Sequence, residues 1–479
     1  MSKSTGLLMS LFLLVCSSVA AGQEMYDPEI PRELIVRLVA GSDVNAFEAD
    51  MNALVSPQQV TRIDEIPSRD VYVYQWPFDL TELYINSNIV SRPDVIWAEM
   101  NYTSQAAEGR VRDFFTGSTQ DPDSYTTQWA WSKINLDYAQ QFASGNNQLI
   151  AVLDTGVDAA HSALQGHLTP GWNFVDNNAD TADVGDNADN DGDGDFDEMV
   201  GHGTFITGII TRMAPDALVL PVKVLNSDGR SDLVTVGKGL FYALDNNASV
   251  INVSLGSTWK SDLWDDAVSE AKNRGVIIVG AAGNQDYNFE LYFEYPAMFR
   301  DVIGVGSTDE ADIKSLFSNY SACQISDPHC DERDQITLVT PGNNIYSTIP
   351  DGQYARWNGT SMSSAMVSAT VSLILSQHPE WPRNESLLLI VKNKITSSAV
   401  NIDGINPLYA GLLGAGRLDL SGAVDLIIPG DLDGDGDVDQ ADLGLLLAAY
   451  QQNANGDLDG DGDTDQADLG ILLANFGAW

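Results

Sequence analysis

The chain has 479 residues, which is enough for about three domains of ordinary size. It carries 68 Asp and Glu residues against 24 Lys and Arg, giving a net charge of −44 at pH 7. This excess of negative charge argues against nucleic acid and anionic membranes as partners. The charge is concentrated, since residues 176–198 hold ten acids, residues 430–479 hold twelve, and neither stretch holds a Lys, Arg or His.

The amino terminus predicts a secretion signal in residues 1–21. Lys3 precedes the apolar run Leu7–Val15, and small residues follow at Ser18–Ala20. The apolar run is too short to span a bilayer. We therefore expect a secreted or cell-surface-associated protein, with a lipoprotein anchor at Cys16 as the less favoured alternative.

Two further cysteines, Cys323 and Cys330, lie close together in the sequence. In an exported chain such a pair favours a disulfide over two free thiols.

Residues 22–105 predict a small α+β domain of β-α-β-β-α-β order, the ferredoxin-like pattern. The expected elements are a strand at Glu33–Ala40, a helix at Val44–Leu54, strands at Val60–Ile66 and Val71–Trp76, a helix at Leu80–Ile89 and a strand at Asp94–Met100. Residues 106–128 are polar and predict an exposed linker that is open to cleavage.

Residues 129–426 alternate between apolar strand-like runs and helical runs. Strands are expected at Leu149–Asp154, Leu218–Leu225, Val250–Leu255, Val276–Ala281 and Val302–Val305, and helices at Thr204–Arg212, Lys238–Asn246 and Leu263–Arg274. This alternation predicts an α/β domain, a parallel sheet with helices on both faces. Functional sites in such sheets gather where strands end, and Asp154, Ser254 and Asn284 lie at or just past such ends.

Ser361 follows Gly359-Thr360 and opens a helical run, Met362–Gln377. The unpaired N–H groups at a helix start would stabilise an oxyanion formed beside its hydroxyl. The alternative is a serine that only caps the helix.

A serine nucleophile needs a histidine base and an acid that orients the imidazole. His202 lies between two glycines at a helix start, and Asp154 ends a buried strand. The amide of Asn284, which ends Gly280–Asn284, can donate to an oxyanion. Taken singly, these residues are equally explained as a loop histidine, a turn acid and a turn-shaping asparagine.

Four segments together resemble the subtilisin-like serine proteases, or subtilases. They are Val152–Val157, Gly201–Thr204, Ala281–Asn284 and Gly359–Met362, in that family's order, within a similarity that runs from about residue 125 to 424. The resemblance implies a subtilisin-like fold with Ser361 as nucleophile, His202 as general base and then acid, and Asp154 as the orienting acid. It also implies that Asn284 and the Ser361 N–H stabilise the oxyanion, and that Ser254, Leu255 and Gly256 border the substrate.

The same resemblance implies that residues 22–105 form a propeptide, which assists folding and blocks the site until it is cut. Three positions depart from the family pattern. Ala365 stands where proline is usual, and Met366 and Phe205 stand where histidine is frequent. Unlike proline, the alanine has an N–H that can donate to the Ser361 carbonyl. This bond would tighten the helix start and shift the Ser361 hydroxyl, which leaves open whether water or an amine attacks the acyl-enzyme.

The carboxyl-terminal acids follow a repeating pattern. Acids alternate along two loops 26 residues apart, each with glycine at position 6 and Asp at position 12. Calcium takes about six to eight oxygen ligands, and this spacing suits it. The expected ligands are Asp431, Asp433, Asp435, Asp437 and Asp442 in the first repeat and Asp457, Asp459, Asp461, Asp463 and Asp468 in the second.

These repeats, residues 430–479, resemble dockerin modules, which are EF-hand-like pairs of helices. The resemblance implies a cohesin-like protein partner, and the alternative is a self-contained calcium-stabilised tail. A third loop has the same alternation at Asp189, Asp191, Asp193 and Asp195, but Val200 occupies position 12. Calcium is expected there too, with a solvated acidic loop as the alternative.

The sequence therefore predicts a monomeric, secreted, calcium-dependent serine endopeptidase that acts on proteins or peptides and is made as a self-processed zymogen. A catalytically idle binding protein with the subtilase fold is the alternative. Acyl transfer to amines, favoured by Ala365, is a third hypothesis.

Overall fold

The computed structural model describes residues 28–109, 115–288, 294–322, 335–425, 430–433, 437–459 and 462–477. The predicted signal peptide, Cys323, Cys330, Asp435 and Asp461 lie outside the described residues. The chain divides into two compact units. Unit 1 is residues 1–103 with 257–259, and unit 2 is residues 104–256 with 260–479.

Unit 1 has the predicted β-α-β-β-α-β order. Its antiparallel strands lie in the order β4 (Val95–Ala106), β1 (Glu29–Leu38), β3 (Val71–Gln75) and β2 (Thr61–Ile66). The connecting elements are α1 (Val44–Val55), η1 (Pro67–Arg69), α2 (Glu82–Ile85) and η2 (Asn86–Val90). Asp43 caps α1 by accepting from the N–H groups of Asn45 and Ala46. Phe47 and Met51 of α1 pack on Leu34 and Tyr74 of the sheet, forming the core of this unit.

Unit 2 is built on a seven-stranded parallel sheet. The strands lie in the order β14 (Leu338–Pro341), β13 (Ile303–Thr308), β12 (Ile277–Ala281), β10 (Val250–Val253), β6 (Leu149–Asp154), β8 (Leu218–Lys223) and β7 (Trp172–Asn173). The central strands β6, β10 and β12 are buried except for the first residue of β6, which explains their continuous apolar sequences. The predicted α/β fold is therefore confirmed.

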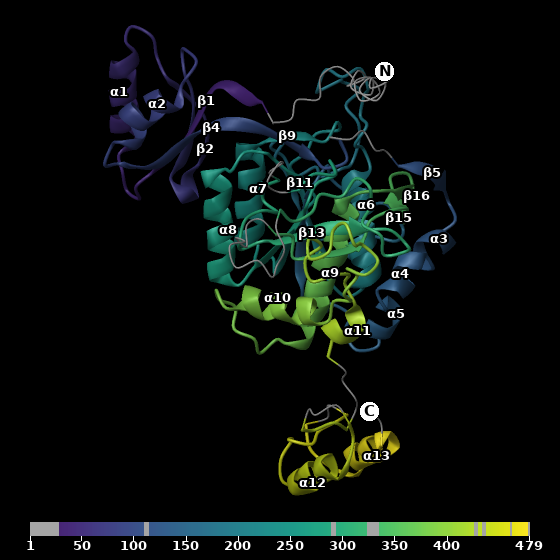
Figure 1. Cartoon of the computed structure of the whole chain (residues 1–479). Helices are drawn as coiled ribbons and strands as arrows, with labels where there is room; N and C mark the ends of the chain where they lie inside the picture. Colours follow the sequence, from purple (N-terminus) through teal and green to yellow (C-terminus); the bar gives the residue numbers. More distant parts are fainter. Residues whose placement is uncertain are drawn as a thin grey trace, which may run out of the picture. The chain divides into compact units, whose positions relative to one another are not determined.

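Two pairs of helices pack on this sheet (Figure 1). In the first pair, α6 (His202–Met213) packs against α9 (Thr360–Gln377), and α9 crosses the central strands. In the second, α7 (Leu233–Asp245) packs against α8 (Asp262–Arg274). Nearly every residue of α9 is buried, which explains its run of small and apolar side chains without a polar face.

Shorter elements complete the domain. They are α3 (Asp123–Thr126), α4 (Trp129–Lys133), α5 (Leu136–Ala139), β9 (Arg230–Asp232), β11 (Leu255–Gly256), α10 (Leu387–Ser397) and α11 (Leu420–Ala423). A separate antiparallel sheet contains β15 (Ile345–Ile349), β16 (Gln353–Trp357) and β5 (Thr116–Thr119).

The prediction of an exposed linker at residues 106–128 is wrong in part. Ala106, Ala107 and Glu108 are buried, and β5 pairs with β16. The ring of Tyr125 is also buried, and its hydroxyl donates to the Gly208 carbonyl at 2.8 Å. The polar backbone of this stretch is used in a sheet, and its few apolar side chains pack into unit 2.

The last part of the chain forms two helices, α12 (Gln440–Ala449) and α13 (Gln466–Asn475), around a core of Val438, Leu446 and Leu472. Asp439 and Asp465 cap these helices, each in a capping box with the acid three residues later. Among the described residues, none of the helices combines the length and apolar character needed to cross a membrane.

Candidate active site

Asp154 and His202 are brought together by a strand end and a helix start. Asp154 is the last residue of β6, and His202 is the first residue of α6. The Nδ1 atom of His202 lies 2.7 Å from Oδ1 of Asp154, and both side chains are buried. A Cβ at position 203 would lie 2.1 Å from the Gly156 carbonyl oxygen, so Gly203 is what allows the helix start to approach this closely.

Asp183 fixes this approach, and the sequence did not single it out. Its carboxylate is buried and accepts from the Gly201 N–H (3.0 Å), the Thr204 N–H (3.0 Å) and the hydroxyls of Thr155 (3.0 Å) and Thr204 (2.6 Å). One acid therefore ties the residue after Asp154 to the first turn of the helix that carries His202. Its place in an acid-rich stretch concealed this role.

Ser361 is the second residue of α9, and Asn284 lies three residues past β12. The Oδ1 atom of Asn284 accepts from the N–H of Thr360 at 2.9 Å and from its hydroxyl at 3.0 Å. Because these two donors fix the carbonyl end of the amide, the Nδ2 group of Asn284 must point the other way.

The carboxylate of Glu108 is where these residues converge. Its Oε2 accepts from the Ser361 hydroxyl at 2.7 Å and lies 2.9 Å from Nε2 of His202. Its Oε1 accepts from Nδ2 of Asn284 at 3.1 Å. Glu108 is fully buried, and the sequence predicted it only as part of a linker.

Two carboxylates therefore flank His202. Burial of the imidazole lowers the pKa of His202, but the charges of Asp154 and Glu108 outweigh burial and hold this pKa well above its usual 6.5. With Glu108 in place, the charged form of the imidazole is favoured, and in that form it cannot accept a proton from Ser361.

The residues predicted to border the substrate contact Ser361 or the end of β4. The carbonyl of Ser254 accepts from the Ser361 hydroxyl at 3.2 Å. Leu255 and Gly256 form β11, which pairs with Ala106 and Gln105 at the end of β4. The Ser254 hydroxyl is buried; it accepts from Nδ2 of Asn252 at 2.8 Å and donates to the Ser361 carbonyl at 3.4 Å.

Comparison with protein families shows that residues 145–430 match the Subtilase family. This chain belongs to the subtilase family. The matched range includes Asp154, His202, Asn284 and Ser361.

Related subtilases are named as proteinases. Thermitase of Thermoactinomyces vulgaris is 35% identical over 267 residues, which is 54% of this chain and 85% of thermitase. A thermophilic serine proteinase of Bacillus sp. (strain AK1) is 33% identical over 60% of this chain, and the match covers 65% of that proteinase. Subtilisin BL of Lederbergia lenta is 30% identical over 60% of this chain and 96% of its own length.

A solved structure confirms the subtilisin-like fold. Fervidolysin from Fervidobacterium pennivorans, described as a keratinolytic enzyme related to subtilisin, matches with a TM-score of 0.64 and 20% identity. The match covers 83% of this chain and 61% of fervidolysin.

The three departures from the family pattern all lie in the interior of the subtilase domain. Ala365 and Met366 are buried in α9. The buried ring of Phe205 packs edge-on against Trp357, with 5.7 Å between centroids. The carbonyl of Ser361 accepts from the Ser364 hydroxyl at 2.9 Å, so a side-chain hydrogen bond also stabilises the first turn of α9.

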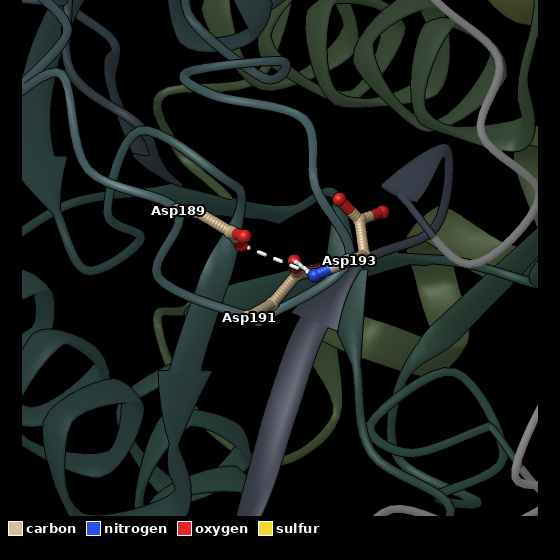
Figure 2. Close-up of side chains that lie close together, drawn as sticks. All are labelled: Asp189, Asp191 and Asp193. Carbon is tan, nitrogen blue, oxygen red and sulfur yellow. Dashed lines mark hydrogen bonds between the residues drawn. The ribbon is translucent and has the colours of Figure 1, made fainter.

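The acidic loop before His202 brings three of its four predicted ligands together (Figure 2). Asp189, Asp191 and Asp193 each offer a carboxylate oxygen within 4.8 Å of the others, and Asp195 lies outside this group. The N–H of Asp193 donates to Asp189 at 3.1 Å and to Asp191 at 3.2 Å.

The surroundings of this loop are strongly negative. Burial of Glu198 and repulsion from Asp228, Asp191 and Asp193 raise the pKa of Glu198 to about 7. Arg230 supplies a positive charge, with its Nη2 atom 2.8 Å from Oδ2 of Asp191.

The carboxyl-terminal repeats gather acids in the same way. Four groups of carboxylates lie within 4.8 Å among the described residues: Asp431, Asp433 and Asp442; Asp437, Asp439 and Asp442; Asp457, Asp459 and Asp468; and Asp463, Asp465 and Asp468. Asp439 and Asp465, the helix caps, join these groups although they were not among the expected ligands. The donor set is made entirely of carboxylate oxygens, which suits a hard cation such as calcium.

Proposed function

We propose that this subtilase is a serine endopeptidase, with Ser361 as nucleophile, His202 as general base and then acid, and Asp154 as the orienting acid. The observation that carries the proposal is the convergence on Glu108. The Ser361 hydroxyl, His202 Nε2 and Asn284 Nδ2 all lie within hydrogen-bond distance of one carboxylate. A carboxylate is planar like a peptide carbonyl, and it is negatively charged like the oxyanion that forms when that carbonyl is attacked. The groups that contact Glu108 are therefore the groups that a peptide carbonyl would meet.

The proposed reaction follows from these positions. With Glu108 displaced, His202 accepts the Ser361 proton through Nε2, while the Nδ1 contact with Asp154 holds the tautomer and stabilises the imidazolium. The oxygen of Ser361 attacks the peptide carbonyl, and Asn284 Nδ2 with the Ser361 N–H stabilises the oxyanion. His202 then protonates the leaving amine, and water hydrolyses the acyl-enzyme.

Casein hydrolysis by a matched pair of variants tests this proposal. Ser361→Ala is expected to lose about 10⁶-fold in kcat. Ser372→Ala is the control, because Ser372 lies on the same helix and its hydroxyl donates to the Ala369 carbonyl of that helix, at 2.8 Å. Ser361→Ala cleaving as well as the parent would refute the assignment, and a parent that never cleaves would favour an idle binding protein.

Residues 22–105 are proposed to be a propeptide that assists folding and blocks the site. The support is that β4 leads directly from unit 1 to Glu108, two residues beyond the end of the strand. Refolding of residues 106–479 with and without a separately made 22–105 fragment tests the folding role. Equal yields in both would contradict it.

Calcium is proposed at the acidic loop of residues 189–193 and at both carboxyl-terminal repeats. The ligands would be Asp189, Asp191 and Asp193 in the loop, and the four carboxylate groups described above in the repeats. The proposed role is structural, because an ion would neutralise carboxylates that otherwise repel one another. Thermal unfolding with and without a chelator tests it, and identical curves would remove calcium from the account.

A cohesin-like protein is proposed as the partner of residues 430–479. Leu445 and Leu447 of α12 and Leu473 of α13 are each about half exposed, which leaves apolar surface for a protein to cover. Calorimetric titration with a purified cohesin domain, with calcium present, should show saturable binding. No heat of binding in any cohesin tested would favour a self-contained tail.

Residues 1–21 are proposed to be a signal peptide that directs export, and the exported protein is proposed to be a monomer. Cell fractionation and size-exclusion chromatography with light scattering test it. A product retained in the cytoplasm, or one that elutes at twice the chain mass, would contradict it.

A further inference from the structure

A short segment of the chain lies in the candidate site as an added strand. Gln105 and Ala106 pair antiparallel with Gly256 and Leu255, respectively. On its other side, the Ala106 N–H donates to the Gly229 carbonyl at 2.9 Å. Strand addition of this kind is a general way for a protein to hold an extended peptide.

The pairing register places the next residue beside the nucleophile. The pairing ends with Ala106 opposite Leu255, and Ala107 and Glu108 follow in a turn. One further step of the same antiparallel register would set Ala107 opposite Ser254. The Ser254 carbonyl accepts from the Ser361 hydroxyl at 3.2 Å, and Ala107 is buried. The carbonyl of Ala107 is therefore the backbone group that the register brings to Ser361.

The following residue, Glu108, lies on the side of His202. Its carboxylate is 2.9 Å from His202 Nε2, the nitrogen that would protonate a leaving amine. The same carboxylate fills the space between the Ser361 hydroxyl and Asn284 Nδ2. A Cβ at Gly359 would lie 1.6 Å from Glu108 Oε1, so only glycine at that position leaves room for it.

We propose that the peptide bond between Ala107 and Glu108 is the bond that this protein cuts in its own chain. This inference rests on the proposed function and names the first substrate of that site. The preceding bond, between Ala106 and Ala107, lies one residue before Ser361, because Ala106 is held opposite Leu255. The following bond is one step too far along, because the same register would carry Glu108 past Ser254 to a position opposite Val253.

The chemistry balances as a hydrolysis. Ser361 Oγ forms a bond to the Ala107 carbonyl carbon, the bond to the Glu108 nitrogen breaks, and His202 passes the Ser361 proton to that nitrogen. Water then releases Ala107 as a carboxylate and regenerates the Ser361 hydroxyl. Before attack, the Glu108 side chain must swing away from Ser361 and Asn284, so it delays the cut.

Intact-mass spectrometry of the full chain, sampled during maturation, tests the position. The expected result is two complementary fragments, one ending at Ala107 and one beginning at Glu108, with Ser361→Ala remaining a single chain. Complementary fragments that meet at any other bond, in a protein that hydrolyses casein, would overturn this inference alone. Absence of both self-cleavage and casein hydrolysis would instead be a failure of the proposed function.

A second variant tests the delaying role of the carboxylate. Glu108→Ala removes the contacts to Ser361, His202 and Asn284, so self-cleavage at the same bond should become about tenfold faster or more. Glu99→Gln, a change in the same strand but in unit 1, is the matched control and should leave the rate unchanged. A slower cut in Glu108→Ala, or one that moves to another bond, would contradict the proposal.

Discussion

The buried acids of the active site and the aspartates of the nearby acidic loop have different surroundings. Asp154, Asp183 and Glu108 are no more than 2% exposed, and each accepts from N–H or O–H groups of the protein. In the loop, Asp189 and Asp191 also accept from protein N–H groups, but Asp189 and Asp193 are partly exposed, and the three carboxylates of Asp189, Asp191 and Asp193 crowd within 4.8 Å of one another.

This difference separates two uses of the same side chain. A carboxylate that is surrounded by protein donors is already stabilised, so it can hold other groups in place. Carboxylates that face one another repel, and a cation from solution relieves the repulsion. The number of acids in a stretch of sequence therefore does not reveal which use applies, because Asp183 and Asp189 come from the same acid-rich stretch.

Removing a hydrogen-bond donor from the buried active site should have the largest effect on activity. Asn284→Ala deletes the Nδ2 group that donates to Glu108 at 3.1 Å and is proposed to stabilise the oxyanion. We expect kcat for peptide hydrolysis to fall by about 10²–10³-fold with little change in KM. An unchanged kcat would show that Asn284 only shapes the loop.

Removing ligands from the acidic loop should reduce the stabilisation by calcium. An ion at about 100 times its dissociation constant stabilises the folded state by about 2.7 kcal/mol. Asp189→Asn with Asp193→Asn should lower the calcium-dependent rise in melting temperature, because both acids belong to the group. Asp195→Asn is the matched control, and an equal loss in the control would contradict the assignment.

Breaking the buried Asp183 network should reduce both stability and rate. Asp183→Ala leaves the Gly201 and Thr204 N–H groups without their carboxylate, and should cost about 1–3 kcal/mol in the free energy of unfolding. Because the helix start that carries His202 loosens, kcat should fall as well. Urea unfolding and steady-state kinetics measure both, and the exposed Asp180→Ala is the control. A loss of stability with kcat intact would limit Asp183 to folding.

The pH dependence of self-cleavage should shift when one of the two charges beside His202 is removed. In the intact chain, Asp154 and Glu108 outweigh the effect of burial and raise the pKa of His202, so the neutral base forms only as pH rises through that value. Glu108→Gln leaves a single carboxylate, so this pKa falls and self-cleavage should begin at lower pH. An unchanged rate–pH profile would show that Glu108 does not control the protonation of His202.

Local patterns in the sequence predicted the central fold, and the resemblance to subtilases implied the meeting of Asp154 with His202. Continuous buried runs such as Leu149–Asp154 predict parallel strands, and strand ends place polar residues at one edge. The hairpin of β15 and β16 was not predicted, although Asp351-Gly352 at its tip is a strong hairpin signal. Both of these residues have positive φ, 65° and 68°.

Glu108 and Asp183 could not be found from sequence for a different reason. Each lies in a polar stretch, and its burial depends on donors that are distant in the chain, such as Ser361 for Glu108. The local indication of burial near Glu108 is the small apolar pair Ala106-Ala107, which lies six residues past the predicted strand Asp94–Met100. Spacing likewise predicted the loop ligands but could not show that Asp195 lies outside the group.

The central claim is that the environment of Ser361 makes its hydroxyl a nucleophile. Reaction of the self-cleaved protein with a fluorophosphonate probe, followed by peptide mass spectrometry, tests this most directly. We predict one covalent adduct, on Ser361, that is lost in His202→Ala. No adduct on the folded, self-cleaved protein, or an adduct on another serine, would contradict the account.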